Sequence, residues 1–347
     1  MAPVAIFGGG AIGGYVGGML ADAGHEVVVI DAWPDHVEAV RRDGLAIEGP
    51  DGTTVTRPAF LHIGEVQSLR RTPPRLVIQS VKLYDTEWAA TLARDFLGDG
   101  VPFLTLQNAL VEETVARIVG WPRVLGGIAT GMNVELAGPG LIRRGSRRFG
   151  PSAVFRVGEL HGRSAPRAEE IAALLGAVDT ATVTTTLWND RWQKLTINAA
   201  VSGLGGIADM SLDEVHTDPR ASAIGLALIA EACAVGRALG FDAGTIYGLA
   251  PDRWLAAAAG SAAAIADARA AYAAQATKIV PGYRSGTLQD LRRGRRTEIE
   301  YYNGFLAAQG AAHGIATPAQ AAIARVVREI EAQEREPCAD NLNDVPW

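Results

Sequence analysis

The stretch that decides the fold is VAIFGGGAIG, residues 4–13. It sets an apolar run, Val4–Phe7, directly ahead of glycines with the spacing G-x-G-x-x-G. A helical pattern follows, and a second apolar run, Val27–Ile30, ends at Asp31. A strand, a glycine-rich turn, a helix and a second strand in this order are typical of the βαβ unit that binds dinucleotides.

Each glycine of this turn has its own expected role. Gly8 permits the tight turn, Gly10 lets the backbone approach a pyrophosphate at the helix N-terminus, and Gly13 allows the helix to pack closely on the strand. The alternative is an ordinary glycine-rich turn, which the complete βαβ pattern disfavours. We therefore expect a cofactor-binding turn formed by Gly8, Gly10, Ala11, Ile12 and Gly13.

Asp31 indicates which nicotinamide cofactor the turn would bind. A carboxylate at the end of the second strand accepts hydrogen bonds from the adenosine ribose hydroxyls and repels a 2′-phosphate. Asp31 therefore favours NAD over NADP. The alternative is an aspartate that caps a helix over Pro34–Val40.

The chain alternates strand and helix patterns up to about residue 187 and is mainly helical afterwards. Leu76–Ile78 and Phe103–Leu106 are short continuous apolar runs, which favour a parallel sheet buried on both faces. Val124–Val134, Gly140–Arg144 and Ala153–Gly158 are expected to add antiparallel strands. These patterns predict an α/β Rossmann domain over 1–187, an all-α domain for substrate and dimerisation over 188–333, and a C-terminal tail over 334–347.

Composition limits the function classes. Apolar residues are 48% of the chain and charged residues 20%, which indicates folded domains. The net charge of −6 makes nucleic acid a poor partner, and the arginine clusters 143–148 and 292–296 are expected to be solvated or ion-paired. No apolar run reaches the roughly 18 residues of a membrane span and no basic leader opens the chain, so we expect a cytoplasmic protein with no membrane partner. The two cysteines and six histidines form no ligand cluster, so no metal is expected.

Lysine is rare in this chain. Only three of the 32 basic residues are lysines, at Lys82, Lys194 and Lys278. A lysine here suits a place where a compact ammonium with a tunable pKa is needed, although chance is the alternative. Lys194 and Asn198 share one helical face, where they would form a carbonyl-polarising pair. A lysine that extends along the surface is the alternative for Lys194.

Polar residues also follow two of the expected strands. Lys82 lies in QSVKLYDT at 79–86, and Asn108 lies in TLQNA at 105–109. Since open α/β sheets bind ligands at the carboxyl ends of their strands, Lys82 would contact a ribose or a substrate carboxylate and Asn108 the nicotinamide side. Loop capping is the alternative for both. Glu298 has apolar neighbours among which a carboxylate needs a partner, with a helix cap or an ion pair as its alternative.

Taken in order, these motifs resemble the ketopantoate reductase (2-dehydropantoate 2-reductase) family over nearly the whole chain. The ordered set is G-x-G-x-x-G, V-K-x-Y-D-T, Q-N, K-L-x-x-N, and L-Q-D followed by T-E-I-E-Y-Y-N-G. The resemblance implies a 6-phosphogluconate-dehydrogenase-like fold, with a Rossmann domain, an all-helical domain and the active site in the cleft between them. It also implies a general acid/base role for Lys194, substrate binding by Glu298 and Asn198, and places for Lys82 and Asn108 beside the nicotinamide and the substrate.

Four residues depart from the family pattern. Asp31 stands where NADPH-using members usually carry an arginine, and Ala109 stands where a glycine usually follows Gln-Asn. In the substrate site, Ser202 replaces a second asparagine and Gly286 replaces a serine.

These residues predict an NAD-dependent oxidoreductase whose small-molecule substrate is a 2-hydroxy acid, a secondary alcohol or the matching 2-oxo compound, rather than pantoate. Its apolar content is compatible with a homodimer. Two alternatives stay open: an NADPH-dependent 2-dehydropantoate 2-reductase of pantothenate biosynthesis, and a non-catalytic NAD(H)-binding sensor.

Overall fold

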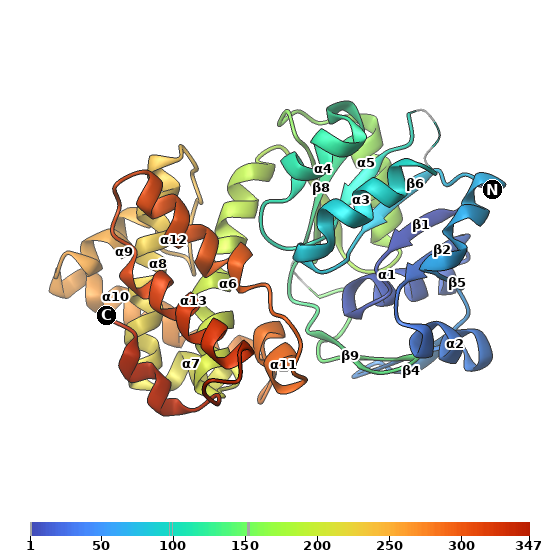
Figure 1. The fold of residues 1–347 in the computed structure, drawn as a ribbon. Helices are drawn as coiled ribbons and strands as arrows, with labels where there is room; N and C mark the ends of the chain where they lie inside the picture. Colours follow the sequence, from blue (N-terminus) through green and yellow to red (C-terminus); the bar gives the residue numbers. More distant parts are fainter. Residues whose placement is uncertain (1, 97, 99, 151–152) are drawn as a thin grey trace. The chain divides into compact units, whose positions relative to one another are not determined.

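The structure is a computed structural model that describes residues 2–96, 98, 100–150 and 153–347. The chain divides into two compact units, Met1–Leu187 and Trp188–Trp347 (Figure 1). The first unit combines β-sheets with helices, and the second is built of helices. This arrangement confirms the predicted fold class, an α/β Rossmann part followed by an all-α part.

An eight-stranded sheet organises the first unit, with the strand order β12-β11-β8-β7-β6-β1-β2-β5. Neighbouring strands are parallel except β8 and β11, which are antiparallel. Phe7 at the end of β1 lies opposite Ile30 of β2 and Gln79 of β6, so these strands end at one edge of the sheet. The strands are β1 (Val4–Phe7), β2 (Val27–Asp31), β5 (Ala59–His62), β6 (Leu76–Gln79), β7 (Phe103–Thr105), β8 (Val124–Ala129), β11 (Phe155–Glu159) and β12 (Ala181–Thr184).

Both faces of this sheet are buried. Val4 and Ile6 of β1 face one apolar core, to which α1 and α5 contribute. Ala5 and Phe7 alternate with them and face a second core, to which α3 and α4 contribute. This double burial explains why the strands are continuous apolar runs. The helices of the unit are α1 (Ala11–Asp22), α2 (Pro34–Asp43), α3 (Thr86–Arg94), α4 (Glu112–Val119) and α5 (Pro166–Gly176).

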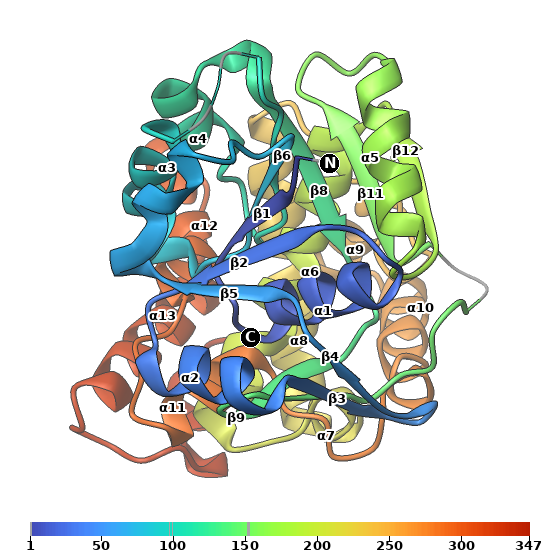
Figure 2. The same ribbon diagram turned by 90° about the vertical axis from the view of Figure 1, so that its right-hand side faces the viewer.

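A second sheet, with the order β4-β3-β10-β9, was not predicted from the sequence. Helix α1 lies between the two sheets (Figure 2): a Cβ at Gly17 would lie 2.7 Å from Val29 of the main sheet, and one at Gly18 would lie 2.8 Å from Ile47 of the second sheet. The strand expected at 124–134 is shorter than predicted, because β8 ends at Ala129. It pairs antiparallel with β11, as expected, and also runs parallel to β7, which was not expected. The strands of the second sheet are β3 (Leu45–Gly49), β4 (Gly52–Thr56), β9 (Val134–Gly138) and β10 (Leu141–Arg144).

In the second unit, α8 contacts α7, α9, α10, α12 and α13. Among the helices of the described ranges, α8 alone is long and apolar enough to cross a membrane, but more than half of it is buried, as in a core helix. The alanine-rich stretch 254–275 forms most of α9 and all of α10. The helices are α6 (Leu187–Ala208), α7 (Leu212–Thr217), α8 (Pro219–Ala238), α9 (Pro251–Ala258), α10 (Ala262–Ala273), α11 (Gly286–Arg292), α12 (Asn303–Ala312) and α13 (Pro318–Glu331), with 3-10 turns η5 (Ile299–Tyr301) and η6 (Ala339–Asp344).

The C-terminal tail docks on the end of α6. The Cys338 N–H and the Asn341 side-chain amide both donate to Ile207 O, at 2.9 and 2.8 Å. Leu342 and Val345 of the tail are buried. The tail therefore packs as part of the helical unit.

Candidate active site

The glycine turn follows β1 and is closely surrounded by backbone. Gly8 has a φ of +98°, and a Cβ there would lie 2.7 Å from Val81 N. A Cβ at Gly13 would lie 2.0 Å from Gly8 O and 2.1 Å from Ser80 Oγ. These two positions accept only glycine, for the turn and for the close packing of α1 respectively.

At Gly10, by contrast, no heavy atom of the described residues lies within 4 Å of the place that a Cβ would take. Helix α1 begins at Ala11, and no side chain in the described ranges caps it. The N–H groups of Ala11, Ile12 and Gly13 therefore lack an acceptor within the helix and lie at the positive end of its dipole. Open space beside unsatisfied N–H groups is an arrangement that fits a pyrophosphate.

Asp31 is held by two backbone N–H groups. Its Oδ2 accepts a hydrogen bond from Gly9 N at 2.7 Å, and its Oδ1 accepts one from Trp33 N at 2.8 Å. The N-cap of α2 is Trp33, so Asp31 does not itself cap that helix. A carboxylate has about four acceptor positions, which leaves room for ribose hydroxyls. The link from Asp31 to the glycine turn was not predicted from the sequence.

A buried amide network holds the Lys82 loop against the end of β7. Gln79 Nε2 donates to Gln107 Oε1 at 2.9 Å, and Gln107 Nε2 donates to Thr86 Oγ1 at 2.8 Å and to Val81 O at 3.0 Å. Lys82 is the N-cap residue of η2 (Leu83–Asp85). The loop carrying Lys82 and the loop carrying Asn108 are thus joined at one sheet edge through Gln107, whose role sequence analysis missed.

Asn108 is half-buried, and none of the described residues hydrogen-bonds its side chain. Ala109 beside it has a φ of +58°, a left-handed conformation that favours glycine. For a residue with a Cβ this conformation costs roughly 1–2 kcal/mol. The conformation gives a physical reason for the glycine that usually follows Gln-Asn in the family that the motifs resemble.

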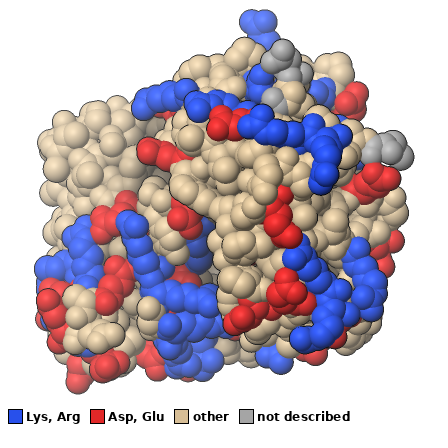
Figure 3. Space-filling view, turned by 45° about the vertical axis from the view of Figure 1, so that its right-hand side comes forward, with Lys and Arg blue, Asp and Glu red and all other residues tan. Residues whose placement is uncertain are grey.

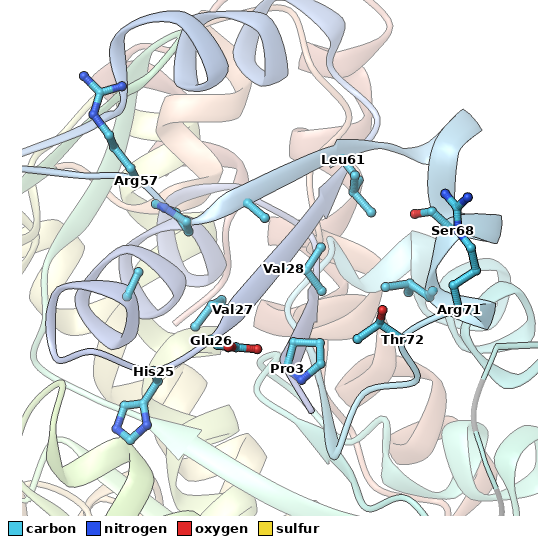
Figure 4. A pocket seen from close by; sticks show the side chains of 14 residues that line it. Pro3, His25, Glu26, Val27, Val28, Arg57, Leu61, Ser68, Arg71 and Thr72 are labelled. Carbon is cyan, nitrogen blue, oxygen red and sulfur yellow. The ribbon is translucent and has the colours of Figure 1, made fainter. Parts of the chain in front are cut away.

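A hollow of about 560 Å³ lies at the other end of the strands. Its lining includes Pro3 and Val27, at the amino ends of β1 and β2 (Figure 4). The side chains of His25, Arg57 and Arg71 lie at separate edges of it and do not converge. Because the glycine turn follows the carboxyl end of β1, this hollow is distinct from the expected dinucleotide site.

In the second unit, α6 carries Lys194, Asn198 and Ser202 at successive intervals of four residues. This spacing places them on one face of the helix. All three are half-buried, whereas Trp192 and Leu195 of the same helix are buried in the core. The described residues offer no hydrogen-bond partner to the Asn198 side chain, which leaves its amide available to a ligand.

The start of α11 lies against this face of α6. Ser285 Oγ donates to Ser202 O at 2.9 Å and accepts from Leu288 N at 3.2 Å. Gly286 follows directly, and the place of its missing Cβ is open. The structure therefore brings together Ser202 and Gly286, the two expected departures in the substrate site.

Glu298 begins η5 and is half-buried. Its Oε2 accepts a hydrogen bond from Tyr302 OH at 3.3 Å. Buried Asn303 donates from Nδ2 to Ala199 O of α6 at 2.8 Å. Asn303 thus fixes the Glu298 segment against the helix that carries Lys194, a role that the sequence motif alone did not indicate.

Parts of the two arginine clusters are ion-paired. Arg144 forms a buried pair with Asp179, and Arg292 pairs with Asp209 at 2.7 Å. On the face drawn in Figure 3, basic and acidic side chains lie interspersed. Both clusters therefore contain arginines that are ion-paired within the protein.

Two family models cover most of the chain. "Ketopantoate reductase PanE/ApbA" matches residues 4–153, and "Ketopantoate reductase PanE/ApbA C terminal" matches residues 186–331. The chain belongs to the ketopantoate reductase family. Its first unit corresponds to the N-terminal part of the family, and its second unit to the C-terminal part.

Curated ketopantoate reductases align with this chain over most of their length. The 2-dehydropantoate 2-reductase of Halobacterium salinarum is 29% identical over 330 residues, which cover 94% of this chain and 97% of the relative. That of Pyrococcus horikoshii is 27% identical and covers 86% and 87%. The chain is therefore an oxidoreductase that acts on a CH–OH donor with a nicotinamide cofactor.

Solved structures share the fold. A PanE/ApbA family ketopantoate reductase from Ralstonia eutropha has a TM-score of 0.78 at 27% identity and covers 96% of this chain and 100% of that one. D-mandelate dehydrogenase, solved with NADH and anilino(oxo)acetate, has a TM-score of 0.79 at 21% identity and covers 98% and 99%. At that identity the likeness to D-mandelate dehydrogenase shows the fold alone.

Proposed function

We propose that this member of the family is an NAD-dependent dehydrogenase of a 2-hydroxy acid or a secondary alcohol, with Lys194 as general acid/base. The observation that carries the proposal is Asp31, whose carboxylate ends β2 and binds the glycine turn through Gly9. Its negative charge repels the 2′-phosphate of NADP and accepts the free ribose hydroxyls of NAD. A preference for NAD favours oxidation as the working direction, since cells tend to keep NAD oxidised.

Lys194, Asn198 and Glu298 supply the chemistry on the substrate side. In oxidation the neutral Lys194 amine takes the proton of the substrate hydroxyl, and in reduction the ammonium returns it to the carbonyl oxygen. The ammonium also stabilises negative charge that develops on that oxygen. The Asn198 amide and the Glu298 carboxylate hydrogen-bond polar groups of the substrate and orient it. Bound nicotinamide accepts or supplies the hydride.

A second candidate is NADPH-dependent 2-dehydropantoate reduction, which the names of the curated relatives favour. Asp31 argues against NADPH as the cofactor, because its carboxylate repels a 2′-phosphate. The third, a non-catalytic NAD(H) sensor, would need neither Lys194 nor Glu298, so the presence of both favours an enzyme.

The cofactor preference has a direct test. We expect kcat/KM to be higher with NAD(H) than with NADP(H), and Asp31→Arg to shift the ratio toward NADP(H). Because Asp31 also binds Gly9 N–H, the variant is expected to lose roughly 10–150-fold in kcat/KM with NAD(H), the size of a lost hydrogen bond to a charged group. Steady-state kinetics with all four cofactor forms measure this. A native chain that uses NADPH as well as NADH would contradict it.

The substrate preference follows from Ser202 and Gly286. Without the larger polar side chains of the family, the site loses two hydrogen bonds for ketopantoate and gains volume for a bulkier or less polar substrate. We expect NAD-dependent oxidation of 2-hydroxy acids, with mandelate in the panel because a dehydrogenase of mandelate shares this fold. Ketopantoate should be reduced poorly with either NADH or NADPH.

The double variant Ser202→Asn with Gly286→Ser tests this substrate preference by gain of activity toward ketopantoate. The Cβ of a serine at position 286 enters open space. Two restored hydrogen bonds should raise kcat/KM for ketopantoate by roughly 5–150-fold. A native value for ketopantoate within about 10⁴–10⁸ M⁻¹s⁻¹ would instead make the chain a plain ketopantoate reductase.

A further inference from the structure

His36 on α2 is fully buried, yet its imidazole bridges two distant peptide groups. Gly140 N donates to His36 Nδ1 at 2.9 Å, and His36 Nε2 lies 2.9 Å from Gly9 O. Since an amide N–H only donates, Nδ1 must be the acceptor, and the single proton of a neutral imidazole is on Nε2. His36 therefore donates to Gly9 O. Burial lowers its pKa, which favours this neutral form.

The hydrogen bond from His36 to Gly9 O also determines the direction of the Gly10 N–H group. In a trans peptide the C=O of one residue and the N–H of the next point in opposite directions. With Gly9 C=O directed at His36, the N–H of Gly10 points the other way. Gly10 is the N-cap of α1 and has open space where its Cβ would be.

The preceding peptide is held as well. Gly9 N–H donates to Asp31 Oδ2 at 2.7 Å, and Gly8 O accepts from Ser80 Oγ at 2.8 Å. Of these two peptides of the glycine turn, the Gly9–Gly10 peptide is the one that bonds His36. Three consecutive glycines have large conformational freedom, so a turn held at both peptides would lose less entropy when a ligand binds.

The other hydrogen bond of His36, from Gly140 N, reaches a turn of the second sheet. Gly140 is in the turn between β9 and β10 and has a φ of +70°. His36 therefore ties the glycine turn of the main sheet to the second sheet, which also packs against α1. The aromatic rings of Trp33 and Phe60 flank the imidazole, with ring centroids at 5.9 and 5.3 Å.

We infer that His36 is a positioning residue for the dinucleotide, which orients the Gly9–Gly10 peptide so that Gly10 N–H faces the pyrophosphate. The inference rests on the proposed function, because it assumes that the glycine turn binds NAD(H). It assigns to His36 no contact with the substrate and no part in proton transfer.

Two conservative variants separate this role from simple packing. In His36→Asn the side-chain oxygen can replace Nδ1 and accept from Gly140 N, but nothing reaches Gly9 O. In His36→Gln the side-chain amide can replace Nε2 and donate to Gly9 O, but the bond from Gly140 is lost. Each variant keeps one hydrogen bond, so both should lower the Tm to a similar extent.

NADH titrations followed by nicotinamide fluorescence, with thermal unfolding alongside, test the inference. His36→Asn should raise the Kd for NADH by roughly threefold to tenfold, the range of one lost hydrogen bond, and His36→Gln should stay within about twofold of the native Kd. Equal Kd values for both variants and the native chain would overturn the inference and leave the proposed function intact. A native chain that binds neither NADH nor NADPH would overturn both.

Discussion

Replacing Lys194 with alanine is expected to lower kcat by roughly 10²–10⁴-fold, the usual effect of removing a positioned acid/base group. Lys194 is half-buried on α6, one helical turn from Asn198. Lys194→Arg should also have a low kcat, because a guanidinium does not release its proton near neutral pH. Steady-state kinetics on the best 2-hydroxy acid substrate give kcat, and fluorescence titration should show a Kd for NADH close to native, since the expected dinucleotide residues belong to the first unit.

The chain contains its own control for this experiment. Lys278 is exposed, and within the described ranges its ammonium group donates to Gln275 Oε1 alone, at 3.3 Å. Lys278→Ala removes the same charge and should leave both kcat and the Kd for NADH unchanged. Turnover by Lys194→Ala equal to that of Lys278→Ala would exclude Lys194 as the acid/base.

Substitutions of Gly13 and Gly10 are expected to differ in their effect on stability, although both residues are in one turn. In Gly13→Ala the new Cβ would lie 2.0 Å from Gly8 O, a backbone atom that cannot move without opening the turn. We expect a loss of about 3 kcal/mol or more in the free energy of unfolding, together with loss of NADH binding.

Gly10→Ser should leave the Tm nearly unchanged, because serine is a favoured N-cap and its Cβ enters open space. Its side chain fills the space expected for the pyrophosphate and competes for the N–H groups of α1. We expect the Kd for NADH to rise by about tenfold or more.

Gly286→Ser is the matched control for Gly10→Ser, since it also adds a serine at an open glycine where a helix begins. It should not change the Kd for NADH. Native affinity in Gly10→Ser, measured by the same titration, would place the phosphates of the cofactor elsewhere.

The sequence by itself determined the dinucleotide unit and the order of the two domains. The glycine spacing, the apolar run Val4–Phe7 and the position of Asp31 are local patterns, and each acts within one turn or one strand. The ordered motifs from Lys82 to Glu298 were enough to indicate the family for the same reason, since each motif is a short segment. Local pattern therefore predicted which residues end a strand or share a helix face.

Only the tertiary structure decided how those residues are held. Asp31 binds Gly9 across 22 residues, Gln107 binds Gln79 across 28, and Asn303 binds Ala199 across 104. The second sheet was missed because β3 pairs with β10, nearly a hundred residues later, and because the glycines that let α1 pack against it resemble those of the cofactor turn. Periodicity shows that a side chain will be buried, but a hydrogen-bond partner far along the chain exists only after the fold brings the two together.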